Sequence, residues 1–442
     1  MIDLLYFALS GIAFGTLAGL IPGFGLTATM AMVGFWFATN NAIDILTFYI
    51  GMLCASQYVG SMMAIGFGVP GESSSMPAVR EGHPLFKQGK GSIAIGTTAI
   101  SSFLGSIISV AIFFSIIVAI QHLLLLWNNS VQVVIYSIAI FLVCTISDNK
   151  WWQSLLMVLL GFHFGLTGHN YGINWDYATF NQPWLYSGLP MIPLVLGLFV
   201  VPELWKANQQ SNAKITPVFD FAVVENFKLC LANWWVITYS SVMGFVCGLV
   251  PTLTTRLASN LSWMVQKQIE VSKQRYTPGG NLNCLVSAET SNNAATFSVL
   301  LPLLLLGIPI TSSEFIVYEF MLKSYDDLNV QWVFDNSTRL LSTFFLVNVV
   351  CLIIAWPLAS NVMKVAKIPK KYLAVILTLM IVFPVVYTGH VNGLLTFYIG
   401  SFVFFATLGL ILRKYDTMPI VFAFLISNQF IAGFVRFYQI HF

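Results

Sequence analysis

The stretch that decides the fold class is residues 92–120, which read SIAIGTTAISSFLGSIISVAIFFSIIVAI and carry no charged side chain. A helix needs about 20 mostly apolar residues to cross the hydrocarbon core of a bilayer. This run is longer than that, and its apolar residues do not alternate with polar ones as they do along the strands of a membrane β-barrel. The segment therefore predicts a helix that spans a membrane.

The composition of the whole chain points the same way. Only 8% of the 442 residues are charged, 57% are hydrophobic, and the mean hydropathy is +0.81. Soluble domains carry about 25% charged residues, so this chain lacks the side chains to cover a surface in water. The net charge of +3 excludes a nucleic-acid-binding protein, which needs a basic footprint. We expect an all-α polytopic membrane protein that sits in a lipid bilayer.

Apolar segments recur along the chain. Several of them, including 26–38, are too short to cross alone or are interrupted by Gly and Pro. We therefore expect about ten to twelve transmembrane helices together with re-entrant or broken helices. The candidate segments are 4–20, 26–38, 44–66, 92–120, 131–147, 151–167, 188–205, 233–250, 285–306, 338–360, 372–388, 393–412 and 417–436.

Signals for a leader peptide or for an enzyme do not occur. The N-terminus has no basic region and its apolar run exceeds signal-peptide length, so we expect Met1 to begin the mature protein. There is no GxSxG, Walker or HExxH motif, and the six cysteines form no CxxC pair. We expect neither an enzyme nor a cofactor. Energy for any transport must then come from an ion gradient or from another polypeptide.

Basic residues gather in a few loops, and the positive-inside rule makes these loops candidates for the cytoplasmic side. Two of the loops, 80–91 and 267–283, are also long polar interruptions of the apolar pattern, as are 168–187 and 206–228. The basic clusters are Arg80/Lys87/Lys90, Lys267/Lys273/Arg275, Lys364/Lys367/Lys370/Lys371 and Arg413/Lys414.

The strongest organisational signal is an internal repeat. Three pairs of segments match in the same order, at offsets of 229, 239 and 226 residues. This pattern predicts two membrane repeats, residues 1–206 and 230–442, joined by a linker at 207–229. Duplicated halves are typical of transporters, often with inverted topology and a midplane site between them. The pairs are GLIPGFGLT (19–27) with GLVPTLTTR (248–256), FGVPGESSS (67–75) with LGIPITSSE (306–314), and IPLVLGLFVVPEL (192–204) with MPIVFAFLISNQF (418–430).

Glycine and proline break the first two pairs of segments. Inside hydrocarbon, such breaks survive only where they are buried or line a cavity. A helix N-terminus there offers N–H groups to an anion, while unwound carbonyls and hydroxyls suit a cation such as Na⁺. We predict a site for a small organic anion near the midplane. Its candidate ligands in the broken segments are Pro22, Gly23, Gly25, Thr27, Gly71, Glu72, Ser73, Ser74, Thr254, Thr255, Arg256, Thr311 and Ser312.

These residues also have plainer interpretations. The first motif is compatible with a simple kink, and Ser73 with a helix cap. Arg256 suits a two-pronged contact with a substrate carboxylate, but also an ion pair with Glu289 or a position at the membrane interface. The residues alone leave these alternatives open.

A polar segment, Ser287-Ala-Glu289-Thr-Ser-Asn292-Asn293, leads into the apolar run 294–306. An acid and two amides at the edge of a membrane segment are costly unless they are used. We predict that Glu289, Asn292 and Asn293 hold a coupling cation, with the two amides also within reach of the substrate. A polar contact between helices is the alternative.

Together the motifs resemble those of a known family. GLIPGFGLT, then GVPGESSSMPAVREGHPLFKQGKGSIAIGTTAISSFLGS, then AETSNNAATFSVLLPLLLLGIP are similar to the large membrane subunit of the tripartite tricarboxylate transporters (TctA-like), and the similarity covers most of the chain. It implies a secondary transporter of organic carboxylates such as citrate, driven by an Na⁺ or H⁺ gradient. It also implies a small four-helix membrane subunit, a periplasmic solute-binding protein and the bacterial inner membrane.

The second half departs from the family's pattern. Its PGxG has Thr252 and Thr254 in place of both glycines, and Ile310 replaces the last glycine of LGIPG. In the first half, Glu81-Gly82-His83-Pro84 stands where the family usually has Asp-Gly-Tyr-Pro. These departures weaken a citrate assignment and leave a di- or tricarboxylate-like anion as the expected substrate. They also motivate an alternative, an uncoupled channel or pore for small solutes on the same fold.

Overall fold

The computed structural model describes residues 2–20, 25–33, 41–68, 73–124, 129–146, 149–170, 174–202, 223–249, 254–307, 309–323, 330–365 and 382–441. This part of the chain is almost entirely helical, which confirms an all-α polytopic membrane protein. The first half contains α1 (Ile2–Leu20), α2 (Gly25–Val33), α3 (Ala42–Phe67), η2 (Ser73–Ser75), η3 (Ala78–Gly82), α4 (His83–Leu85), η4 (Phe86–Lys90), α5 (Gly91–Leu124), α6 (Asn129–Ile146), α7 (Trp151–Leu166), η5 (Pro183–Leu185), α8 (Met191–Val195) and η6 (Leu196–Val200). The second half contains α10 (Val223–Ala232), α11 (Trp234–Gly248), α12 (Thr254–Ser272), α13 (Leu282–Ser298), α14 (Leu300–Leu306), α15 (Ser312–Lys323), α16 (Val330–Asp335), α17 (Ser337–Val365), a helix at Val382–Val391, α19 (Leu395–Ile411) and α20 (Met418–His441).

Among the described residues, four helices are long and apolar enough to cross a membrane. Two bent helix pairs raise this number to six if each pair forms one span. One pair is α10 with α11, bent by 76°, and the other consists of two parts of α20, bent by 47°. These bends confirm the expectation of broken helices, and the total of ten to twelve crossings stays a prediction. The four spans are Asp3–Leu20, Ala42–Phe67, Ala78–Ile116 and Ser337–Ala355.

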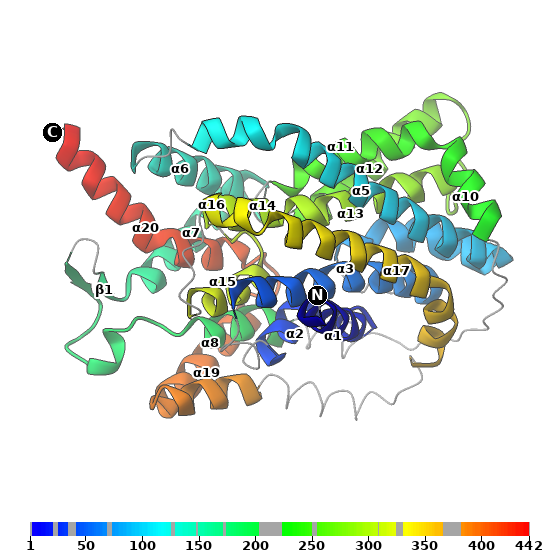
Figure 1. Ribbon diagram of the computed structural model, residues 1–442. Coiled ribbons are helices and arrows are strands. Elements are labelled where there is room, and N and C mark those ends of the chain that lie inside the picture. Colours follow the sequence, from blue (N-terminus) through cyan, green and yellow to red (C-terminus); the bar gives the residue numbers. More distant parts are fainter. Residues whose placement is uncertain are drawn as a thin grey trace.

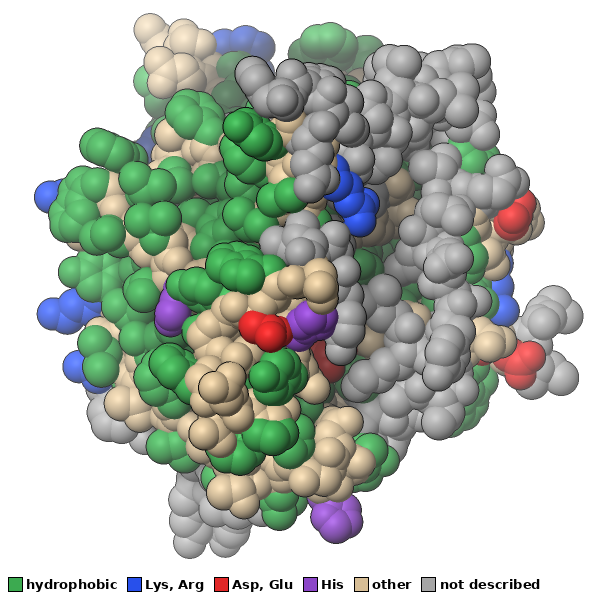
Figure 2. All heavy atoms as spheres, turned by 90° about the vertical axis from the view of Figure 1, so that its left-hand side faces the viewer, with side chains coloured by type: hydrophobic (Ala, Val, Ile, Leu, Met, Phe, Trp, Pro, Cys, Tyr) green, Lys and Arg blue, Asp and Glu red, His purple; other side chains and the backbone are tan. Residues whose placement is uncertain are grey.

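The long helices lie side by side, and the two ends of the bundle differ (Figure 1). One end carries the C-terminus and a small antiparallel hairpin of β1 (Gly168–Asn170) and β2 (Trp175–Tyr177), with α10 near the other end. Across the hairpin, His169 Nδ1 lies 2.7 Å from Asp176 Oδ1. Figure 2 looks onto this end and shows acidic and histidine side chains surrounded by hydrophobic and uncharged polar ones.

Helices α3 and α13 form the centre of the fold. Every residue of α3 except Asp44 is buried, and α13 is buried from Cys284 to Ser298. Helix α1 packs along α3, while α5, α11 and α12 pack along α13. Polar groups on these two helices are therefore enclosed by protein rather than by lipid.

Glycines allow close packing around both central helices. On α1 they recur every four residues, at Gly11, Gly15 and Gly19, and a Cβ atom added at Gly15 would lie 2.2 Å from the carbonyl oxygen of Met52 on α3. On α11, a Cβ atom at Gly244 would lie 2.3 Å from a backbone oxygen of α13. Small residues at this spacing let membrane helices approach closely. Gly15 and Gly244 are 229 residues apart, which is the offset of the first repeated motif.

We expect Gly15→Ala to lower the free energy of unfolding by about 1–3 kcal/mol, because the new methyl group must push α1 away from α3. Thermal unfolding of the purified protein in one detergent measures the change. Gly400→Ala on α19 is the matched control, since a Cβ atom there meets nothing within 4 Å. An equal loss of stability in both variants would contradict close packing as the cause.

The matched motifs break their helices in the same way. Helix α3 ends at Gly68 (φ 67°, ψ 20°) and α14 ends at Gly307 (φ 64°, ψ 24°), both in the left-handed conformation that glycine adopts without strain. Helix α1 ends at Leu20 before α2, and α11 ends at Gly248 before α12. The breaks are thus confirmed, whereas the two repeats and their inversion stay predictions. Helix α10 begins at Val223, inside the predicted linker.

Candidate functional site

The predicted ligands lie on several elements. Pro22, Gly23, Gly71 and Glu72, and the side chains of Ser73 and Thr254, lie outside the described residues. Gly25 and Thr27 lie in the first turn of α2, and Ser74 lies in η2. Thr255 and Arg256 lie in the first turn of α12. Glu289, Asn292 and Asn293 lie in the middle of α13, and Thr311 and Ser312 lie at the start of α15.

Glu289 is fully buried where α13 faces α3. Ser61 Oγ of α3 donates a hydrogen bond to Glu289 Oε2 at 2.5 Å. The other oxygen, Oε1, is buried and has no hydrogen-bond partner among the described residues. Arg256 forms no ion pair with this carboxylate, which removes one of the alternatives for that arginine. An uncompensated buried carboxylate is costly, so Glu289 is a strong candidate for binding a cation or a proton.

Asn292 follows three residues later, on the same face of α13. Asn292 Nδ2 donates to Gln57 Oε1 at 3.0 Å, and Ser74 Oγ donates to the same oxygen at 3.3 Å. Asn292 Oδ1 is buried without a hydrogen-bond partner in the described part of the chain. These bonds join η2, α3 and α13, so the serine motif of the first half meets the polar motif of the second half.

Asn293 points away from this meeting place, toward α5. Its Nδ2 donates to Ser102 Oγ at 2.7 Å and to the backbone oxygen of Glu289 at 3.2 Å. Ser109 Oγ of α5 donates to the next backbone oxygen of α13, that of Ala294, at 2.7 Å. The surroundings of Asn293 therefore favour a contact between helices over cation binding.

Three partners of the polar residues on α13 were not predicted from the sequence: Gln57, Ser61 and Ser102. Gln57 is the only amide side chain in the apolar segment 44–66, and that isolation was a usable signal. The two serines give no such signal, because small hydroxyls are common in membrane helices and bond to their own backbone there.

The cluster of Gln57, Ser61, Glu289 and Asn292, here called the α3–α13 site, is rich in acceptor oxygens. Glu289 Oε1 and Asn292 Oδ1 have no donor among the described residues and lie on adjacent turns of one helix. Oxygen ligands of this kind suit hard cations such as Na⁺. Within the described residues, no group of three or more His, Cys, Asp or Glu side chains is placed to hold a metal ion. The donor set thus fits an alkali cation rather than a transition metal.

The start of α15 is organised differently, by a capping box. Glu314 Oε2 accepts from the backbone N–H groups of Ile310 (2.8 Å) and Thr311 (3.0 Å), and Thr311 Oγ1 accepts from the N–H of Glu314 (3.3 Å). The Ser313 hydroxyl lies 2.7 Å from Tyr49 OH of α3. Ser312 Oγ lies 3.7 Å from the sulfur of Met418. This helix end already holds a carboxylate of its own, which disfavours a substrate anion there.

Another buried carboxylate, Glu81, holds the loop between α12 and α13. It accepts hydrogen bonds from Trp263 Nε1 (2.9 Å), Tyr276 OH (3.2 Å), Gly280 N (3.2 Å) and Asn281 N (2.9 Å). Burial, and next the Glu81 carboxylate, raise the pKa of Tyr276 to about 12, so its phenol stays protonated and donates. The segment 80–84 therefore ties the first half of the chain to the second.

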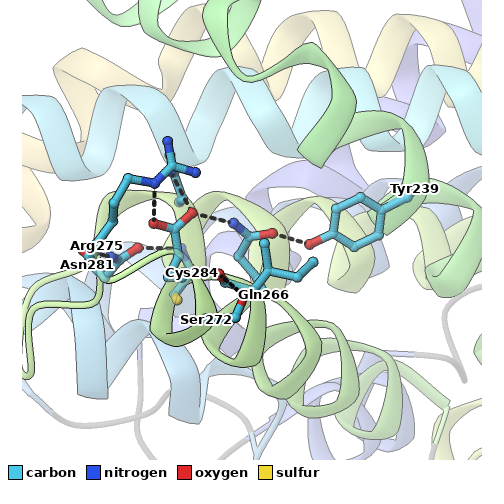
Figure 3. Close-up of polar contacts among 9 residues, drawn as sticks. Tyr239, Gln266, Ser272, Arg275, Asn281 and Cys284 are labelled. Carbon is cyan, nitrogen blue, oxygen red and sulfur yellow. Dashed lines mark hydrogen bonds and ion pairs between the residues drawn. The ribbon is translucent and has the colours of Figure 1, made fainter.

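A polar network continues from this loop along α12 to α11 (Figure 3). Glu270 is 2% exposed, and its Oε1 accepts from Gln266 Nε2 (2.8 Å) and Asn283 Nδ2 (3.1 Å). Glu270 Oε2 lies 3.6 Å from Arg275 Nε, and Tyr239 OH donates to Gln266. The network stiffens the α12–α13 hairpin, and Glu270 and Arg275 neutralise each other's charge.

Comparison with known proteins identifies the family. A relative from Agrobacterium vitis, described as "Uncharacterized 52.8 kDa protein in TAR-I ttuC' 3'region", is 26% identical over 303 residues, which are 68% of this chain and 60% of the relative. This chain thus spans less than two thirds of that relative's length. No solved structure is a significant match. The sequence pattern of the "Tripartite tricarboxylate transporter TctA family" matches residues 5–423, which include the whole α3–α13 site. The protein therefore belongs to the TctA family of tripartite tricarboxylate transporters.

Proposed function

We propose that this protein is the membrane subunit of a tripartite uptake system that carries a small organic anion, such as a di- or tricarboxylate, with a cation gradient as the energy source. The observation that carries the proposal is the α3–α13 site, where one oxygen of a buried carboxylate, Glu289 Oε1, and a buried amide oxygen, Asn292 Oδ1, have no donor among the described residues. A coupling cation, Na⁺ or H⁺, would satisfy Glu289 Oε1 and Asn292 Oδ1. Its binding and release would then be linked to movement of the surrounding helices.

The anion would bind beside that cation, at the start of α12. Helix α12 packs against η2, and Ser74 of η2 is bonded to Gln57 of the α3–α13 site. Thr255 and Arg256 lie in the first turn of α12, where N–H groups and a positive side chain favour a carboxylate. The start of α15 suits an anion less, because Glu314 already holds it. Placed this way, substrate and cation would both lie next to η2, and each would favour the other's binding.

The family supports the remaining parts of the proposal. TctA proteins belong to tripartite systems, so we propose a small four-helix membrane subunit and a periplasmic solute-binding protein as partners. The expected location is the inner membrane of a bacterium, with the basic segments 80–91 and 267–283 toward the cytoplasmic side; in the structure most of 80–91 is helical and continues into α5.

An uncoupled pore is the second candidate function. The glycines lost at Thr252 and Ile310 motivate it. Thr252 lies outside the described residues, and Ile310 is 1% exposed with its N–H bonded to Glu314. A pore would let the solute equilibrate but never accumulate.

Uptake of labelled di- and tricarboxylates into proteoliposomes, with the partner subunits present, tests both functions. Coupled transport predicts accumulation above the external concentration when an Na⁺ or H⁺ gradient is imposed, and collapse of that accumulation when an ionophore removes the gradient. Flux that saturates but stops at equal concentrations would support the pore. Absence of any gradient-dependent uptake would refute the coupled carrier.

A further inference from the structure

Two cationic side chains lie against the indole ring of Trp263, whose N–H group donates to Glu81. Arg80 Cζ and Lys267 Nζ each lie 4.9 Å from the centroid of the Trp263 ring. Lys267 Nζ also lies 5.1 Å from the centroid of the Tyr276 ring. Arg80 comes from the first half of the chain and Lys267 from α12, so the tertiary structure brings these two like charges together.

Neither cation forms an ion pair with a carboxylate in the described part of the chain. Glu81 is adjacent to Arg80 in the chain, but its oxygens accept from Trp263, Tyr276 and two backbone N–H groups. Glu270, on the next turn of α12 after Lys267, is paired with Arg275. The two positive charges are thus held in place by aromatic rings and remain available to an anion.

The surface beside these cations is largely apolar and includes one exposed polar residue, Gln268, between Met264 and Val271. Along α12, Leu261 is 38% exposed, Met264 is 58% exposed and Val271 is 53% exposed. Their spacing places them on one side of the helix, next to Lys267. A small hydrophilic anion would gain nothing from contact with these apolar side chains, whereas an acyl chain would bury them. Trp and Tyr rings beside basic residues are also typical of the depth at which lipid headgroups lie.

We propose that Arg80 and Lys267 bind the phosphate of an anionic phospholipid, whose acyl chains lie along Leu261, Met264 and Val271. Basic pockets between membrane helices recognise anionic headgroups in this way. Because Trp263 and Tyr276 also donate to Glu81, a lipid bound here would brace the α12–α13 hairpin. The site is separate from the α3–α13 site, so it stands even if the proposed substrate or coupling ion is wrong.

Lipid binding to the full-length, delipidated protein in a neutral detergent tests this. Short-chain phosphatidylglycerol and phosphatidylcholine with the same acyl chains are compared, with binding read by native mass spectrometry and by the shift in thermal unfolding. We expect phosphatidylglycerol to bind roughly 30-fold more tightly, as two cations near an anionic headgroup should provide. The double variant R80Q/K267Q should reduce this preference to less than about threefold.

Two further variants and two soluble anions make the result specific. K87Q/K90Q removes the same charge from exposed lysines of η4 and should keep the preference, as should R80K/K267R, which retains both charges. Unfolding without lipid checks that each variant is folded. Equal affinity for the two lipids, or an equal loss in K87Q/K90Q, would overturn the proposal. Inorganic phosphate or citrate that displaces the lipid at millimolar concentration would assign the cations to a soluble anion and overturn the lipid as ligand.

Discussion

Replacing Glu289 by glutamine should abolish the dependence of uptake on the cation gradient. The amide has nearly the same size but no charge, so the α3–α13 site loses its only acidic ligand. Contacts to charged groups are worth about 1.5–3 kcal/mol, which corresponds to cation binding that is about 10- to 100-fold weaker. We expect initial uptake rates with and without the gradient to become equal in proteoliposomes.

The same variant should remain well folded, because a buried amide is less costly than a buried carboxylate. Its thermal unfolding midpoint is therefore expected to match or exceed that of the parent protein. Glu225→Gln, the same change on the exposed α10, is the control and should leave coupling intact. Gradient dependence that survives in Glu289→Gln would show that the coupling cation binds elsewhere.

Replacing Glu81 by alanine should cause the largest loss of stability. The change leaves the indole N–H of Trp263, the phenol of Tyr276 and two loop N–H groups without their acceptor. A buried donor left unpaired costs about 1–3 kcal/mol, and we expect a total of about 4 kcal/mol because some donors will regain water in the opened loop. Thermal unfolding in detergent measures this loss.

Local opening of the α12–α13 loop gives a second measurement. Lys273 and Arg275 are trypsin sites in that loop, and cleavage there should be much faster in Glu81→Ala than in the parent protein. Trp263→Phe, which removes only one donor to Glu81, should lose about 1 kcal/mol and keep the loop largely resistant. If Glu81→Ala is cut no faster than Trp263→Phe, the carboxylate is not what holds the loop.

Local pattern was enough to predict the membrane class and the positions at which helices break. Uncharged apolar runs such as 92–120 can only be satisfied as buried or lipid-facing helices, and Gly68 and Gly307 end helices because glycine alone enters the left-handed conformation without strain. The T-x-x-E pattern that begins at Thr311 is a local capping signal as well, although we interpreted Thr311 as a substrate ligand. The sequence likewise singled out Glu289 and Asn292, because polar side chains are rare inside membrane helices.

The partners of these residues were decided by tertiary structure alone. Ser61 and Glu289 are 228 residues apart in the chain. Glu81 and its partners in the second half are separated by up to 200 residues. Nothing local distinguishes Ser61 from other serines, or Asn292 from its neighbour Asn293, until α3 and α5 take their places on two sides of α13. Helical periodicity determines which face a side chain occupies, but only packing determines what that face meets. By itself, then, the sequence determined a helical membrane transporter with broken segments. The packing of α3, α5 and α12 around α13 decided which of its polar groups have partners among the described residues and which do not.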